Sequence, residues 1–180
     1  MTAPAHYWQP SDVDKIIAAA PPGPARLFAL FLWRTGARRA EALAAKWKDL
    51  DFEANPPELR IPKGKGGKWR LVPVHPELAQ ALAYHPDRGK HDARLFPLSP
   101  RTANRIIEAA IIDAGLVPKA DRAYRPGPHS LRHSAIRHWL ASGVPLNQVS
   151  LWAGHSQITT TMKTYLPLVP DHAGNMERVA

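Results

Sequence analysis

The chain has 180 residues, of which 44% are apolar and none is cysteine. This length and composition fit one domain with a hydrophobic core, and they exclude a disulfide scaffold, a thiolate zinc site and a cysteine nucleophile. The longest apolar runs are too short to span a membrane, and the N-terminus lacks the pattern of a secretory signal, so we expect a cytoplasmic protein.

The formal net charge is +9, and it is unevenly distributed along the chain. Residues 60–70 contain five basic and no acidic side chains, and residues 119–138 contain five basic side chains and one acidic. Outside these two windows the basic and acidic residues balance. Segregated positive charge of this kind favours a polyanionic partner such as nucleic acid, although two solvated basic loops also fit the pattern.

The apolar spacing predicts a mainly helical chain with one β-hairpin. Ser11 is a suitable N-cap for a first helix, which ends at the Pro/Gly-rich residues 21–24. Residues 58–74 change to an alternating pattern around a Gly/Lys-rich turn, which predicts two edge strands of a very small sheet. Further helices are expected on both sides of Gly36 within residues 25–47, from Pro76, from Ser99 to Gly115, at about 129–142 and 145–153, and in a last stretch that ends at Pro167.

Two segments place basic side chains where an anion can bind. Arg38 follows the turn at Gly36 and begins a helix, where its charge adds to that of the amides, and Glu41 can orient it. An ordinary salt bridge at the helix start is the alternative. Lys65 lies at the glycine-flanked tip of the hairpin turn, from which it can reach a phosphate, although a solvated turn has the same composition.

The segment from His129 to His133 combines an imidazole and a guanidinium. His129 and Arg132 are three residues apart and share a helix face. Arginine can bind two phosphate oxygens with its fork, and histidine can transfer a proton, but a capping histidine beside a surface arginine fits equally well. A zinc pair of His129 and His133 is disfavoured, because the pattern lacks the Glu of H-E-x-x-H and Arg132 would lie beside the ion.

Together, four segments resemble the catalytic domain of the tyrosine recombinase (phage integrase) family. They are Thr35–Leu43, Gly64–Pro73, His129–Ser134, and Leu151–Thr161 followed by Tyr165. The resemblance runs from about residue 10 to 168 and implies a helical bundle with a small antiparallel hairpin or sheet. We therefore expect one catalytic domain over residues 1–180, with its core at 10–168 and a tail at 169–180, and without the helical domain that usually precedes it in the family.

The resemblance also implies site-specific DNA recombination in a bacterial, phage or mobile-element setting. A tyrosine attacks the scissile phosphate, forms a 3′-phosphotyrosine and frees a 5′-hydroxyl, so no metal or nucleotide cofactor is implied. The partners implied are double-stranded DNA and further copies of the chain in a tetrameric synapse. The catalytic residues that it implies are Arg38, Lys65, His129, Arg132, His155 and Tyr165, and the expected DNA contacts are Arg39, Lys63, Lys68, Arg70, Arg122 and Arg125.

The roles implied for these residues follow the chemistry of phosphoryl transfer. The two catalytic arginines and His155 are expected to bind the non-bridging oxygens, Lys65 to protonate the leaving oxygen, and His129 to exchange a proton near the Tyr165 nucleophile. A straight helix would hold His155 and Tyr165 about 15 Å apart, so we expect a break near residues 159–161 and a mobile Tyr165. A non-catalytic DNA-binding module and a type IB topoisomerase-like relaxing activity remain as alternatives.

Overall fold

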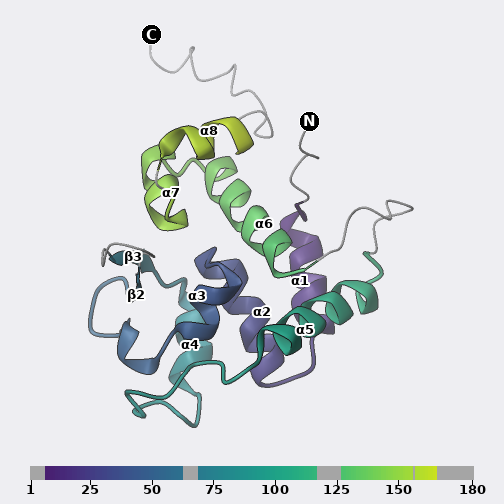
Figure 1. Ribbon diagram of the computed structural model, residues 1–180, viewed down its shortest axis with the longest axis vertical. Coiled ribbons are helices and arrows are strands. Elements are labelled where there is room, and N and C mark those ends of the chain that lie inside the picture. The colour runs from purple at the N-terminus through teal and green to yellow at the C-terminus, as the bar shows by residue number, and fades with distance from the viewer. Residues whose placement is uncertain (1–6, 63–68, 117–126, 156, 166–180) are drawn as a thin grey trace.

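The computed structural model describes residues 7–62, 69–116, 127–155 and 157–165 (Figure 1). These ranges form a mainly helical fold with one small antiparallel sheet, which confirms the predicted fold class. The elements are α1 (Pro10–Ala19), α2 (Pro24–Thr35), α3 (Arg39–Ala44), the 3-10 helix η1 (Trp47–Asp49), β1 (Leu50–Asp51), β2 (Glu58–Pro62), β3 (Trp69–Pro73), α4 (Pro76–Ala83), α5 (Pro100–Asp113), α6 (Pro128–Ala141), α7 (Leu146–Ala153) and α8 (Ile158–Tyr165).

Proline begins five of the described helices: α1, α2, α4, α5 and α6. Its fixed φ suits the first helical position, and the N–H that it lacks would have no partner there. At α5 the hydroxyl of Ser99 accepts a hydrogen bond from the Thr102 N–H (3.1 Å), as expected of an N-cap. Ser11 was wrongly expected to cap α1, because that helix already begins at Pro10 and Gln9 occupies the capping position.

The predicted hairpin is present as β2 and β3, and β1 adds a third, two-residue strand that the sequence did not indicate. Leu59 pairs with Val72 and Ile61 pairs with Arg70. Side chains two residues apart on a strand lie on the same face. Arg70 therefore lies on the buried face with Val72, and this placement decides its role in the site.

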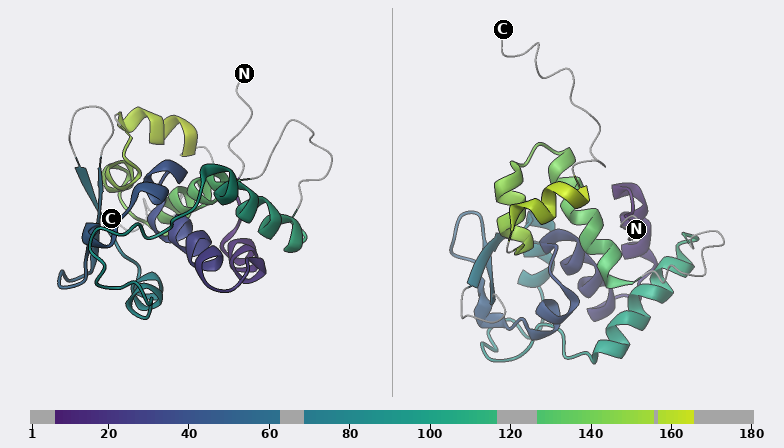
Figure 2. Two further views of the ribbon diagram at one scale, coloured as in Figure 1. Left: turned by 60° about the horizontal axis from the view of Figure 1, so that its bottom comes forward. Right: turned by 45° about the horizontal axis from the view of Figure 1, so that its top comes forward.

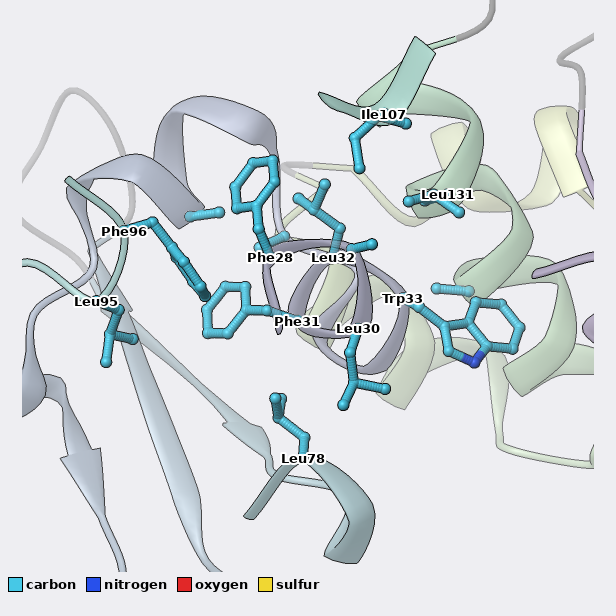
Figure 3. Close-up of a cluster of buried hydrophobic side chains, with 14 of the residues drawn as sticks. Phe28, Leu30, Phe31, Leu32, Trp33, Leu78, Leu95, Phe96, Ile107 and Leu131 are labelled. Atoms are coloured by element: carbon cyan, nitrogen blue, oxygen red, sulfur yellow. The ribbon is translucent and has the colours of Figure 1, made fainter. Parts of the chain in front are cut away.

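Helix α2 is the centre of the main core, where it packs against α1, α3, α4 and α6. Figure 3 shows Phe28 and Phe31 of α2 directed toward Phe96, and both pairs of rings meet edge to face at centroid distances of 5.2 and 5.1 Å. This is a favourable geometry for aromatic rings, and it anchors the segment before α5 to α2. Helix α2 ends at Gly36, and the carbonyl of this glycine is one of the groups that position the site residues described below.

Helices α7 and α8 lie beside α6 at one end of the molecule (Figures 1 and 2). Gly154 ends α7 in the left-handed conformation (φ +67°), and α8 begins at Ile158. The predicted break between His155 and Tyr165 is therefore present, but it lies before residues 159–161, because α8 already begins at Ile158 and runs through them. No helix in the described ranges is long and apolar enough to cross a membrane.

Candidate active site

Arg132 on α6 connects three parts of the chain. Its side chain is buried (residue exposure 4%), and its guanidinium donates to the carbonyl oxygens of Gly36 (2.5 Å) and Ala153 (2.7 Å). It also lies 3.2 Å from Nε2 of His155. Burial and the nearby charge of Arg38 lower the pKa of Arg132 to about 10, so it remains a cation at neutral pH.

Arg38, which immediately precedes α3, is the more accessible cation of the site, with 42% of its side chain exposed. Its Nη1 pairs with Oε1 of Glu41 (2.9 Å), and its backbone N–H donates to Oε2 of the same carboxylate (2.7 Å). Its Nη2 donates to the carbonyl of Gly154 (3.2 Å). Arg38 and Glu41 thus form the salt bridge that the sequence suggested at the helix start, and part of the guanidinium remains exposed.

Glu41 also binds Arg70, which crosses from β3. Nη1 and Nη2 of Arg70 donate to the two carboxylate oxygens (3.0 and 2.8 Å), and Nε donates to the carbonyl of Trp152 (2.8 Å). Burial raises the pKa of Glu41, but the hydrogen bonds and charge of Arg70, together with the hydrogen bonds from Arg38, outweigh it and lower the pKa below its ordinary value.

These contacts contradict our expectation that Arg70 binds DNA. Only 1% of its side chain is exposed, and its guanidinium, unlike that of Arg132, is paired with a carboxylate that neutralises its charge. The alternation along β3 turns Arg70 inward, away from a ligand in solvent. Arg70 instead has a structural role: its hydrogen bonds connect the sheet to α3 and α7.

Two glycines bring backbone carbonyls to the arginines. Gly36 has φ +57°, and a Cβ there would lie 2.7 Å from the ring of Trp139. Gly154 has φ +67°, and a Cβ there would lie 2.7 Å from Nη1 of Arg70. Both the left-handed backbone and the close approach favour glycine at these positions.

Tyr165, the last residue of α8, is 2% exposed and lies within the site. Its ring stacks on that of His155, with centroids 6.4 Å apart and planes inclined by 12°. Nδ1 of His155 lies 2.7 Å from Oγ1 of Thr161. The break between α7 and α8 therefore brings His155 and Tyr165 together, as predicted.

The hydroxyl of Tyr165 is hydrogen-bonded to Nδ1 of His133 (2.5 Å). We had assigned the proton exchange near this tyrosine to His129, which is exposed on α6, with its ring centroid 6.2 Å from that of His133. In the described part of the chain, His133 is the histidine bonded to the Tyr165 hydroxyl. The signal available in the sequence was its position beside Arg132, and we had considered it only as a metal ligand.

Burial controls the protonation of these groups. It lowers the pKa of both His133 and His155 to about 4, with a further contribution from neighbouring positive charges that include Arg132. Burial raises the pKa of Tyr165 to about 12, although the charges of Arg132 and Arg38 oppose this. At neutral pH the two imidazoles are therefore neutral and the phenol keeps its proton.

The other expected residues are only partly described. Nη1 of Arg39 donates to Oδ1 of Asn104 on α5 (2.8 Å), beside the site. No group of three His, Cys, Asp or Glu side chains within the described ranges could hold a metal ion. The expected residues that lie outside those ranges are Lys63, Lys65, Lys68, Arg122 and Arg125.

The site thus brings two arginines, two histidines and a tyrosine together within this helical fold. The sequence model of the phage integrase family matches residues 7–170, nearly the whole chain. The chain therefore belongs to the phage integrase family.

Individual relatives agree with this assignment. Tyrosine recombinase XerD of Mycobacterium tuberculosis is 37% identical over 144 residues, which cover 72% of this chain and 43% of the relative. The catalytic domain of bacteriophage HP1 integrase has the same fold, with a TM-score of 0.72 at 24% identity over 96% of this chain and 94% of that one. So does XerH recombinase bound to its palindromic difH substrate in a post-cleavage complex, with a TM-score of 0.74 at 21% identity over 96% of this chain and 52% of that one. The chain thus spans less than half the length of the curated XerD relative.

Proposed function

We propose that this chain is the catalytic part of a site-specific DNA recombinase, which cleaves and rejoins DNA strands through a phosphotyrosine bond. One observation carries the proposal: His155, in the segment after α7, lies against both the guanidinium of Arg132 on α6 and the ring of Tyr165 on α8. Simple DNA binding does not need a buried tyrosine beside an arginine and a histidine. The family membership and the DNA-bound XerH relative support the same conclusion.

In the proposed cleavage step, Oη of Tyr165 attacks phosphorus and the bond from phosphorus to the 5′-oxygen breaks. Arg38 and Arg132 stabilise the negative charge that develops on the non-bridging oxygens. Arg132 is preorganised for this role, because the carbonyls of Gly36 and Ala153 already hold its guanidinium in place. We assign protonation of the leaving 5′-oxygen to Lys65, on the family resemblance.

The proposed role of His155 requires one local change. Arginine has only donors, so the contact with Arg132 makes Nε2 of the neutral His155 ring an acceptor. A hydrogen bond from Nε2 to a phosphate oxygen therefore requires that nitrogen to gain a proton. A phosphate between Arg132 and His155 favours this change, because a nearby negative charge raises the pKa of an imidazole.

We propose that the surrounding cations hold double-stranded DNA and that several copies of the chain assemble on it. Arg39 lies beside the site, and the hairpin and loop residues expected to contact the backbone are Lys63, Lys68, Arg122 and Arg125. Affinity that rests on such contacts decreases as salt rises, because binding releases counterions from DNA. Tyr165 is buried, so we also expect α8 to shift when DNA enters.

A covalent adduct tests the proposal. Labelled duplexes of randomised sequence, nicked near the scissile position so that the cleaved fragment diffuses away, are incubated with the protein and separated under denaturing conditions. The wild-type chain should retain label and Tyr165→Phe should not, whereas Tyr84→Phe, at an exposed position after α4, should behave as wild type.

Three other outcomes would contradict the proposed nucleophile, the proposed catalysis or the proposed strand exchange. An adduct in Tyr165→Phe would exclude this nucleophile. DNA binding without an adduct in the wild type would favour the non-catalytic module. An adduct accompanied by relaxation of supercoiled DNA, without exchange of strands between duplexes, would favour the topoisomerase-like activity.

A further inference from the structure

His133 has a position in the site that the family resemblance did not assign. It follows Arg132 on α6 and lies between two rings: its centroid is 5.6 Å from that of Tyr165 and 6.2 Å from that of His129. Its Nδ1 lies 2.5 Å from the Tyr165 hydroxyl, a distance at which a proton can pass directly between the two atoms. The bond joins α6 to α8 across 32 residues of sequence.

We propose that His133 is the proton acceptor for Tyr165, an inference that rests on the proposed function. In cleavage, the bond from Tyr165 Oη to phosphorus forms as the phenolic proton passes to Nδ1 of His133. The bond from phosphorus to the 5′-oxygen breaks, and that oxygen takes a proton from the general acid assigned to Lys65. In rejoining, the 5′-hydroxyl returns its proton to that acid, and the departing phenolate recovers its own from His133.

The other groups around the hydroxyl are less suited to accept this proton. Arg132 and Arg38 are cations and have no lone pair to offer. Both nitrogens of His155 are engaged, Nε2 with Arg132 and Nδ1 with Thr161, and its ring is nearly parallel to that of the tyrosine. Among the described residues this leaves His133 in contact with the proton to be moved.

The protonation states fit an acceptor that acts only when substrate is present. The charged or titratable groups that face His133 are His129 and Arg132 on α6, Tyr165 on α8 and His155 after α7. Burial keeps the imidazole neutral, so a ring protonated on Nε2 offers its Nδ1 lone pair to the phenol. With a pKa of about 4 for the base and about 12 for the acid, transfer is unfavourable before DNA binds.

Bound DNA should bring the pKa values of His133 and Tyr165 closer together. A phosphodiester beside Arg132 brings a negative charge that favours the imidazolium form of His133. As the new bond to phosphorus forms, electron density leaves the phenolic oxygen and its proton becomes more acidic. In the free protein the hydrogen bond to His133 therefore leaves the proton on the phenol of Tyr165. During attack the same His133 nitrogen accepts that proton.

Two substitutions separate proton transfer from positioning. His133→Gln can still accept a hydrogen bond from the tyrosine but cannot take its proton, and His133→Ala can do neither. Both should slow single-turnover adduct formation on the nicked duplexes by about 10²–10⁴-fold, the usual range for a lost general base. His138→Gln is the matched control, because His138 lies on the same helix but packs against Trp33, with ring centroids 5.2 Å apart.

The decisive measurement replaces Tyr165 by fluorinated tyrosines, which lower the pKa of the phenol. Cleavage by His133→Gln should recover as the phenol becomes more acidic, while cleavage by the protein with His133 intact should change little. Equal dependence on phenol acidity in both proteins, or a wild-type rate for His133→Gln, would overturn the proposal. Absence of an adduct in the otherwise unaltered chain would instead contradict the proposed function itself.

Discussion

Arg70 on β3 grips both carboxylate oxygens of Glu41 on α3, and through Glu41 it is linked to Arg38 in the site. The carboxylate of Glu41, with 14% of its side chain exposed, thus binds two arginines that have different roles. Arg70 connects the sheet to the helices and is almost wholly buried. Arg38 keeps 42% of its side chain exposed, where a ligand can reach it. The geometry of the residues proposed to bind phosphate therefore depends on an ion pair outside the proposed reaction.

We predict that Arg70→Ala costs about 3 kcal/mol of folding free energy, because it leaves the largely buried carboxylate of Glu41 without its main partner. Arg60→Ala, at an exposed position of the same hairpin where the guanidinium covers Trp69, should cost less than about 1 kcal/mol. Chemical denaturation measures both. Arg70→Met, which removes the charge, should leave the salt dependence of DNA affinity unchanged, and a shallower slope would mean that Arg70 contacts phosphate after all.

Gly154→Ala should destabilise the protein by about 2–4 kcal/mol, because the new Cβ is strained at φ +67° and collides with Arg70. Gly143 provides a matched control after α6: its φ is +83°, and a Cβ there would meet nothing within 4 Å. Gly143→Ala should therefore cost only the backbone strain, about 1 kcal/mol. Thermal or urea unfolding compares the two, and equal losses would show that the contact with Arg70 contributes nothing.

Stability should decrease in mild acid because of two partly buried histidines, His133 and His155. The folded protein holds the pKa of His133 and of His155 near 4, below the ordinary value of 6.5. The stability that depends on their neutral forms is fully present above about pH 6.5 and is lost as the pH falls from 6.5 through 4. Each should contribute about 1–2 kcal/mol of loss between pH 7.5 and pH 5.

Urea unfolding at the two pH values checks this, and His133→Gln and His155→Gln should each flatten the pH dependence. His91→Gln, at an exposed position in the segment before α5, should leave it unchanged. An undiminished pH dependence in both variants would mean that other groups titrate.

The segment before α1 should stabilise the helix that carries Arg132. The backbone N–H of Trp8 donates to Ser134 Oγ (2.7 Å), and its ring Nε1 donates to Ser130 Oγ (3.0 Å), both on α6. Trp8→Phe should therefore cost about 1 kcal/mol for one lost hydrogen bond, and Trp8→Ala about 3–5 kcal/mol.

Hydrogen exchange provides the test for this contact. Amide protection along α6 should fall in Trp8→Ala, while Trp69→Phe, at an exposed position, should leave it unaltered. Undiminished protection of α6 in Trp8→Ala would show that the N-terminal segment does not support this helix.

Much of the fold follows from local patterns along the chain. Helical periodicity and proline positions predicted most of the described helices, and alternation predicted the hairpin. The ten residues between His155 and Tyr165 required a break, although its location depended on Gly154 rather than on residues 159–161. Such features depend on neighbours within a few residues, which is why the sequence can predict them.

The sequence by itself determined the helical fold class, the hairpin, the spacing that breaks the chain before Tyr165 and the pairing of Arg38 with Glu41. Only the tertiary structure decided that Arg70 is a buried partner of Glu41 and that His133 bonds the Tyr165 hydroxyl. These contacts join residues 29 and 32 positions apart. Local periodicity indicates which face of an element is buried, but the partner on that face depends on how distant elements pack.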